Sequence, residues 1–99
     1  MLNCIRKIKE YTKGLSKTEF ANNELIQDAV IRNIEIIGEA TKKVSINLKQ
    51  NYYEIPWKEM SGMRDKLIHD YMGVDIDVVW KTIENDIPII DKLIKNIKL

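Results

Sequence analysis

The sequence has a single cysteine, Cys4, so it cannot form an intrachain disulfide. A reducing compartment is the usual setting of such a chain, and we expect the cytoplasm. Only four glycines and two prolines interrupt the 99 residues, which leaves room for few turns and favours helices. A long apolar run is also lacking. Residues 1–13 carry four lysines and arginines, and they match neither a secretory signal nor a membrane span.

An excess of charge of one sign is lacking as well, because the chain has 16 basic and 15 acidic residues. A non-specific nucleic-acid binder usually has a strong basic field. RNA would therefore have to bind at a local site or on a surface built from two chains. The length predicts one domain over residues 1–99, and a domain this small buries only about 60–65% of its surface, which favours oligomers.

Apolar residues recur at helical spacing along most of the chain, and no alternating strand pattern competes. A first helix should end near Gly14, and Ser16–Glu19 fits a capping box that opens a short helical turn. Longer helices are predicted from Asn23 to about Lys49, from Trp57 to near Tyr71, bent around Ser61-Gly62, and after the capping residue Asp75, with a kink at Pro88. The expected fold is all-α, a four-helix up-down bundle.

The helix predicted after Asn23 has apolar residues around much of its circumference, so we expect burial on more than one side, as in a bundle or a dimer core. Gly38 interrupts it, and such a glycine usually marks the close approach of another helix. Arg32, Glu35 and Glu39 form a polar stripe, which is either a solvated face or support for a site. The apolar positions are Leu25, Ala29, Ile36, Ala40 and Val44 in one row, broadened by Val30, Ile34, Ile37 and Leu48.

The residues with catalytic potential gather between Met63 and Tyr71. His69 is the only histidine, and Arg64 stands five residues before it, about 140° around a helix and roughly 7.5 Å along its axis. Arg64 and Tyr71, seven residues apart, fall on nearly the same face. The spacing suggests a shared site, to which a second chain could contribute half.

An arginine and a histidine suit RNA cleavage. Attack of a 2′-hydroxyl on the adjacent phosphorus needs a group that titrates near neutrality, such as His69, and a fixed cation against the developing charge, such as Arg64. No metal is required, and the chain has too few cysteines and histidines for a zinc site. Asp65 and Asp70 flank the motif, either as solvated residues or as groups that orient His69 or Arg64.

Arg64 to Tyr71 resembles the Arg-x4-His-x-Tyr signature of the HepT-like branch of the HEPN superfamily. Three other stretches resemble the same family in the same order, although the first helix here is shorter than is usual in it. They are residues 31–40 (IRNIEIIGEA), residues 55–57 (IPW), and Val78-Val79-Trp80 followed by residues 85–88 (NDIP).

The resemblance implies a homodimeric helical bundle whose two motifs form a metal-independent ribonuclease site of Arg64 and His69. It implies a toxin paired with an MntA-type nucleotidyltransferase antitoxin, which uses ATP and Mg to transfer AMP to Tyr71 and so inactivates the toxin. The ribonuclease itself would need no cofactor. Two alternatives stay open: a non-catalytic helical partner that presents a nucleotide or substrate to a nucleotidyltransferase, and a plain helical dimerisation module.

Overall fold

A computed structural model describes residues 1–67 and 75–97, and within these ranges all regular structure is helical. The all-α class predicted from the sequence is therefore confirmed for the described part. In chain order the elements are α1 (Leu2–Thr12), α2 (Lys17–Ala21), α3 (Glu24–Lys42), α4 (Ile46–Asn51), α5 (Trp57–Ser61), α6 (Met63–Leu67), α7 (Ile76–Lys81), the π-helical segment η1 (Thr82–Asp86) and α8 (Ile87–Ile94).

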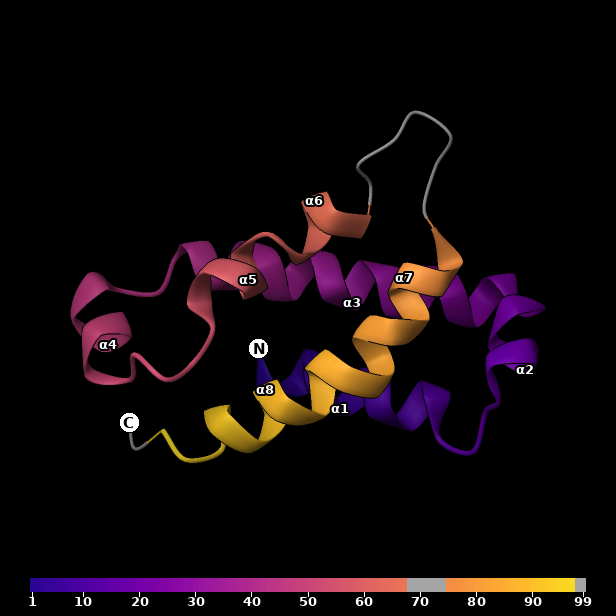
Figure 1. Cartoon of the computed structure of the whole chain (residues 1–99), viewed down its shortest axis with the longest axis horizontal. Helices are drawn as coiled ribbons and strands as arrows, with labels where there is room; N and C mark the ends of the chain where they lie inside the picture. Colours follow the sequence, from indigo (N-terminus) through magenta and orange to yellow (C-terminus); the bar gives the residue numbers. More distant parts are fainter. Residues whose placement is uncertain (68–74, 98–99) are drawn as a thin grey trace.

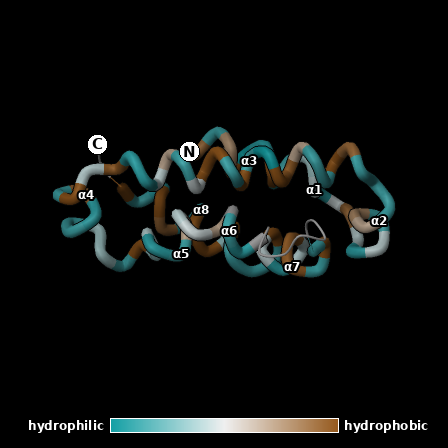
Figure 2. The backbone as a smooth tube through the Cα atoms, turned by 90° about the horizontal axis from the view of Figure 1, so that it is seen from above, coloured by the Kyte–Doolittle hydropathy of each residue, from teal (hydrophilic) through white to brown (hydrophobic). Residues whose placement is uncertain are grey.

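The helices form a flat arrangement in which α1 and α3 lie in one layer and α5, α6 and α7 in a second (Figures 1 and 2). The short helices α2 and α4 lie at opposite ends of the molecule. The shortest extent of the molecule is 17 Å, which fits only two layers of helices. In the described part, no helix combines the length and apolar character needed to cross a lipid bilayer.

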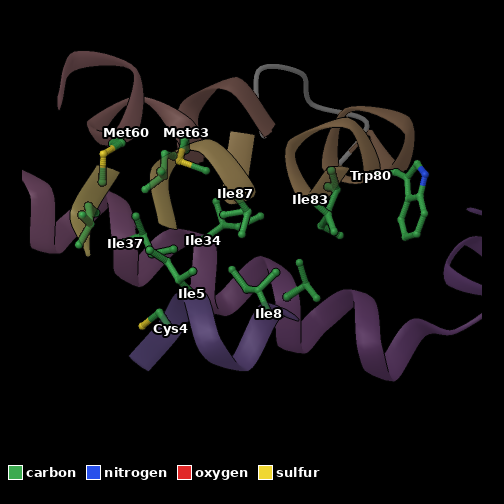
Figure 3. Packing of buried hydrophobic residues seen from close by; sticks show 14 of the residues in the cluster. Cys4, Ile5, Ile8, Ile34, Ile37, Met60, Met63, Trp80, Ile83 and Ile87 are labelled. Carbon is green, nitrogen blue, oxygen red and sulfur yellow. The ribbon is translucent and has the colours of Figure 1, made fainter. Parts of the chain in front are cut away.

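The hydrophobic core fills the space between the layers (Figure 3). Ile5 of α1 and Ile34 of α3 are fully buried, as is Met60 of α5, and Ile87 of α8 is 1% exposed. The core therefore joins helices that are far apart in the sequence. Its other buried apolar members are Cys4, Ile8, Phe20, Val30, Ile37, Ile55, Trp57, Met63, Val79, Trp80, Ile83, Ile90 and Ile94.

The predicted helix boundaries are confirmed where a capping residue marks them. Gly14 has a φ of 76°, the left-handed conformation that a glycine adopts at little cost after a helix. Ser16 and Glu19 form the capping box, and hydrogen bonds from the Ser16 backbone and side chain hold the pKa of Glu19 below its usual value. Asn23 and Asp75 cap α3 and α7 through their side-chain oxygens.

The prediction of one helix from Asn23 to about Lys49 is wrong, because α3 ends at Lys42 and α4 begins at Ile46. Ser45 causes the second start: its hydroxyl oxygen accepts a hydrogen bond from the backbone N–H of Leu48, at 3.1 Å. A serine that caps a new helix competes with continuation of the old one.

The apolar residues of α3 are not all buried. Val30, Ile34 and Ile37 are fully buried, but Leu25 is 81% exposed and Ile36 is 36% exposed. The prediction that this helix is buried on more than one side holds in part: α3 packs against α1 of its own layer and against α5 and α6 of the second layer, but its outer face stays uncovered in the single chain. The physical reason is the thickness of the molecule, because no third layer covers the face of α3 that points away from the core.

The C-terminal helices are held to the rest of the molecule at two places. The rings of Phe20 in α2 and Trp80 in α7 lie 5.3 Å apart between centroids. In α8 the carboxylate of Asp91, with 8% of its side chain exposed, accepts a hydrogen bond from Lys9 of α1 and pairs with Lys95 at 3.1 Å. Pro88 stands in the first turn of α8, directly after η1.

Candidate active site

The motif begins on α6, and the neighbouring helix α5 is fixed firmly in the fold. Trp57, 9% exposed, donates a hydrogen bond from Nε1 to the carbonyl oxygen of Tyr52 at 3.0 Å. Met60 is fully buried, and Met63, the first residue of α6, is 5% exposed (Figure 3). The apolar residues before the motif therefore anchor the start of α6 in the core.

The break predicted around Ser61-Gly62 is confirmed, because α5 ends at Ser61 and α6 begins at Met63. Gly62 links the two helices: its N–H donates to the carbonyl of Lys58 at 3.1 Å, and its carbonyl accepts from the N–H of Lys66 at 2.9 Å. The motif helix therefore changes direction while keeping its backbone hydrogen bonds.

The junction between α5 and α6 rests against Gly38 of α3. A Cβ atom at Gly38 would lie 3.5 Å from the carbonyl oxygen of Ser61 and 3.6 Å from that of Met60. The close approach predicted for Gly38 is thus confirmed, and it brings the start of the motif helix against the middle of the longest helix.

The structure places only part of the predicted site. The backbone of Arg64 lies in α6, beside Asp65, whose side chain is exposed. The side chain of Arg64 lies outside the description, and so do His69, Asp70 and Tyr71. The convergence of Arg64, His69 and Tyr71 therefore stays a prediction. Of these three residues, Arg64 has its backbone in the described helix α6.

The other predicted supports lie on α3. Arg32 and Glu39 are on the outer face of that helix, with intrahelical partners: Arg32 Nη1 is 4.0 Å from Glu35 Oε2, and Glu39 Oε1 is 3.4 Å from Lys42 Nζ. The Arg32 side chain is 72% exposed and that of Glu39 is 60% exposed. Such pairs fit the solvated stripe, one of the two interpretations of these residues.

Sequence reasoning missed a hollow that borders the motif helix. It has a volume of about 430 Å³, within the usual size range of ligand pockets. Met60 and Met63 line it from α5 and α6, Ile89 and Ile90 from α8, and Lys66 adds a cation. The residues from α5 and α6 are separated from those of α8 by more than twenty positions in the chain, so no local pattern could have revealed the hollow.

Metal ligands do not gather in the part of the molecule that is described: residues 1–67 and 75–97 contain no group of three or more His, Cys, Asp or Glu side chains placed to hold a metal ion. A metal-independent reaction remains a prediction from the residue types of the motif.

Comparisons with known proteins cover almost the entire chain. The model of the family described as "Ribonuclease HepT-like" matches residues 1–97. The probable ribonuclease HepT of Thermococcus cleftensis is 50% identical over 85 residues, which make up 86% of this chain and 77% of that protein. "Putative RNase MJ1216" of Methanocaldococcus jannaschii is 45% identical over 102 residues, 99% of this chain and 84% of that protein. No solved structure gives a significant match.

These relatives match the chain through the described helices and through the segment of the motif alike. The resemblance stated for the sequence is therefore confirmed at the level of the family. A family model spanning residues 1–97 and relatives at 45–50% identity leave one conclusion: the chain belongs to the HepT-like family of ribonucleases.

Proposed function

We propose that the chain is the toxin of a toxin–antitoxin pair in the cytoplasm and cleaves RNA without a metal ion, using Arg64 and His69. The observation that carries the proposal is the presence of Arg64-x4-His69-x-Tyr71 in a chain of a ribonuclease family. The packing of the junction between α5 and α6 against Gly38 supports it, because an arginine on a helix whose start is fixed can hold a phosphate in a defined position.

The proposed reaction is an internal transesterification. The 2′-oxygen of one nucleotide forms a bond to the adjacent phosphorus, and the bond from phosphorus to the 5′-oxygen of the next nucleotide breaks. His69 takes the 2′-hydroxyl proton or gives a proton to the departing 5′-oxygen, because an imidazole titrates near neutral pH. Arg64 stabilises the negative charge on the phosphoryl oxygens with its planar guanidinium.

The histidine count supports a shared site. The reaction needs both a base and an acid, and one chain has one imidazole. Two copies of the chain would bring two imidazoles and two guanidinium groups to one cleft. We therefore propose a homodimer as the active species.

The fold of this proposed toxin is an up-down bundle whose four arms are α1, α3, the α5–α6 pair and the α7–α8 pair, with a bend near Pro88. The π-helical segment Thr82–Asp86 just before Pro88 supports the bend. Proline lacks the N–H that would donate to Glu84 and clashes with its carbonyl, so the helix must adjust there.

The proposed switch is adenylylation of Tyr71. An MntA-type nucleotidyltransferase antitoxin would transfer AMP from ATP, with Mg, to the tyrosine hydroxyl and release pyrophosphate. The product carries a negatively charged phosphate seven residues from Arg64. It would pair with the guanidinium and occupy the space that an RNA backbone needs.

Cleavage of a single-stranded RNA by the purified chain in the presence of EDTA tests the ribonuclease. Arg64→Ala and His69→Ala should each lower the rate by a factor of about 100 or more, while helical circular dichroism stays unchanged. Glu59→Gln, an exposed residue on α5, serves as the control and should cleave at the normal rate. Normal cleavage by both motif variants would contradict the assignment and favour a non-catalytic partner of a nucleotidyltransferase.

Mass spectrometry after incubation with an MntA-type nucleotidyltransferase, ATP and Mg tests the switch. The chain should gain one AMP on the peptide that contains Tyr71, and Tyr71→Phe should gain none because it lacks the acceptor hydroxyl. Addition of AMP to that same peptide in Tyr71→Phe would overturn the switch.

A further inference from the structure

The hollow that borders α6 is lined by charged side chains that the fold leaves unpaired. It lies between the α5–α6 pair on one side and η1 and α8 on the other, with a volume of about 430 Å³. Within the described residues, the side chains of Lys58, Lys66 and Asp86 line it and make no ion pair or hydrogen bond. Charged groups at a concave surface that serve no contact of the fold are available to a ligand.

The hollow between α1 and α8 shows the opposite arrangement. Of the residues that line it, Asp91 pairs with Lys9 and Lys95, and Glu10 pairs with Arg6 at 2.8 Å. These charges thus neutralise one another within the chain. A charged ligand there would have to break existing ion pairs, whereas a ligand in the hollow beside α6 would not.

The two lysines of the hollow beside α6 stand in a row. The N–H of Gly62 donates to the carbonyl of Lys58, and the N–H of Lys66 donates to the carbonyl of Gly62, so the three residues follow at intervals of one helical turn. Gly62 has no side chain and leaves a gap between the lysines. Two cations about two turns apart, with open space between them, suit a phosphodiester backbone.

The remaining lining of this hollow is largely apolar. Met60 is fully buried and Ile90 is 3% exposed, so these residues close the bottom. Ile89 on α8, which is 56% exposed, adds accessible apolar surface. A nucleobase is apolar on its faces and can lie against such side chains, while its phosphates stay outside.

Asp86 adds a hydrogen-bond acceptor to the lining. It stands directly before α8, but its side chain does not cap that helix. An ionised carboxylate only accepts hydrogen bonds. Among the RNA bases, guanine offers two adjacent N–H donors on its pairing edge, at N1 and N2, and these match the two oxygens of one carboxylate.

We propose that the hollow beside α6 binds one unpaired nucleotide of the substrate RNA, with guanine preferred. The base lies on the apolar bottom with its N–H groups toward Asp86, and the flanking phosphates pair with Lys58 and Lys66. This inference rests on the proposed function, because it takes RNA as the substrate. It also supplies the local binding site that a chain without an excess of basic residues needs.

The hollow is a neighbour of the proposed cleavage site and not part of it. Arg64 and Lys66 occupy positions about 160° apart around α6, so the two residues mark different sides of this helix. A helix with its side chains is about 10–12 Å across, a distance that a single strand of RNA spans within a few nucleotides. The nucleotide in the hollow would therefore fix the register of the strand and select the phosphodiester that reaches Arg64.

Methyl NMR on the whole chain tests the location. The probe is a uridine oligonucleotide with one central guanosine, 2′-O-methylated throughout so that it cannot be cleaved. The methyl signals of Met63 and Ile89, which line the hollow, should shift on addition of this RNA. Ile46 on α4, an isoleucine that is 72% exposed, is the matched control and should not shift. The same oligonucleotide paired with its complement should shift neither lining signal, because a paired base cannot enter.

Two variants of Gly62 test the space. Its φ is −91°, and a Cβ atom would lie 3.5 Å from the nearest atom, the carbonyl oxygen of Lys58, so a side chain is accommodated there. Gly62→Leu extends into the hollow and should weaken binding of the oligonucleotide at least about ten-fold, whereas Gly62→Ala should bind it nearly as the wild type does. Thermal unfolding followed by circular dichroism confirms that both variants remain folded.

Variants of the charged residues test the two kinds of polar contact. Lys58→Ala and Lys66→Ala should each reduce the slope of log affinity against log salt by about 0.7, the value for one phosphate of a single strand. Lys43→Ala, at an exposed lysine that ends α3, is the control and should leave the slope unchanged. The wild type should bind the guanosine probe at least about five-fold more tightly than a probe with adenosine in its place, and Asp86→Asn should lose this preference.

The outcomes separate this inference from the proposed function. A probe that does not bind, or binds without shifting Met63 and Ile89, overturns the subsite even if the chain cleaves RNA, and so does unaltered binding by Gly62→Leu. Equal binding of the guanosine and adenosine probes overturns the role of Asp86. Shifts at the hollow that disappear in Gly62→Leu support the subsite even if the chain cleaves no RNA.

Discussion

The two faces of α3 are alike in sequence and different in structure. Ile34 and Ile37 on the inner face are fully buried between the layers, whereas Ile36 and Leu25 on the outer face are in contact with solvent. All four fit the same helical pattern of apolar residues. The helical spacing of apolar residues thus predicts the helix, but it does not show which of them are buried. Whether other helices of the same chain cover a given position depends on the thickness of the fold.

Substitution of one isoleucine on each face should give the largest contrast. Ile34→Ala removes buried methyl groups and leaves a cavity, so the free energy of unfolding should fall by about 2–5 kcal/mol. Ile36→Ala, at a protein concentration low enough to keep the chain monomeric, should change it by less than about 1 kcal/mol. Urea unfolding followed by circular dichroism measures both values. Equal losses would show that the outer face is covered within the single chain.

A smaller effect is expected at the charged contact between α1 and α8. Asp91→Asn keeps the shape of the side chain but removes the negative charge that Lys9 and Lys95 share. We expect a loss of about 1–3 kcal/mol in the free energy of unfolding, which lowers the Tm by roughly 4–8 °C per kcal/mol in a domain of this size. Lys92→Met on the exposed side of α8 is the control and should change little.

The contribution of Asp91 should depend on pH. Burial of Asp91 opposes its charged form, but the hydrogen bonds from Lys9 and Lys95, together with the positive charges of these two lysines, outweigh burial and hold the pKa of Asp91 below its usual 3.8. The stabilisation is therefore complete above that usual pKa and is lost as the pH falls through the lower pKa of the folded state. The difference between wild type and Asp91→Asn should stay constant from pH 5 to pH 8 and shrink below about pH 4. A difference that grew toward acid pH would contradict this assignment.

Local chemistry explains which parts of the fold were predictable. The ends of helices at Gly14, Ser16, Asn23 and Asp75 followed from residues whose side chain or φ angle acts within a few positions. The break at Ser45 was missed because the apolar residues continue past it and nothing in the pattern favours a cap over a mid-helix serine. The side-chain amide of Gln27 is a second feature that the pattern did not reveal. It donates hydrogen bonds to the carbonyls of Phe20 and Ala21 and so ties α3 to α2.

The candidate site was predictable in its chemistry and less so in its setting. Arg64 and His69 could be selected because they are the residue types that cleavage of a phosphodiester needs, and the helix carrying Arg64 was expected. The support of that helix by Met60, Met63 and Gly38 depends on contacts between segments far apart in the sequence. The hollow next to α6 belongs to the same class of features, which only the assembled fold reveals.

The smallest effect is expected for Gly38→Ala, at the place where the inner face of α3 meets α5. A methyl group at this position would lie 3.5 Å from the Ser61 carbonyl oxygen, which is ordinary van der Waals contact. Gly38→Ala should therefore gain up to about 1 kcal/mol in the free energy of unfolding from its better helix propensity. Gly38→Val adds two further methyl groups toward the α5 backbone and should destabilise the fold by about 1–3 kcal/mol. A gain for alanine and a loss for valine, measured by urea unfolding, would show that α3 and α5 are separated by the width of one methyl group. A loss for both would mean that the helices approach more closely than a methyl group allows.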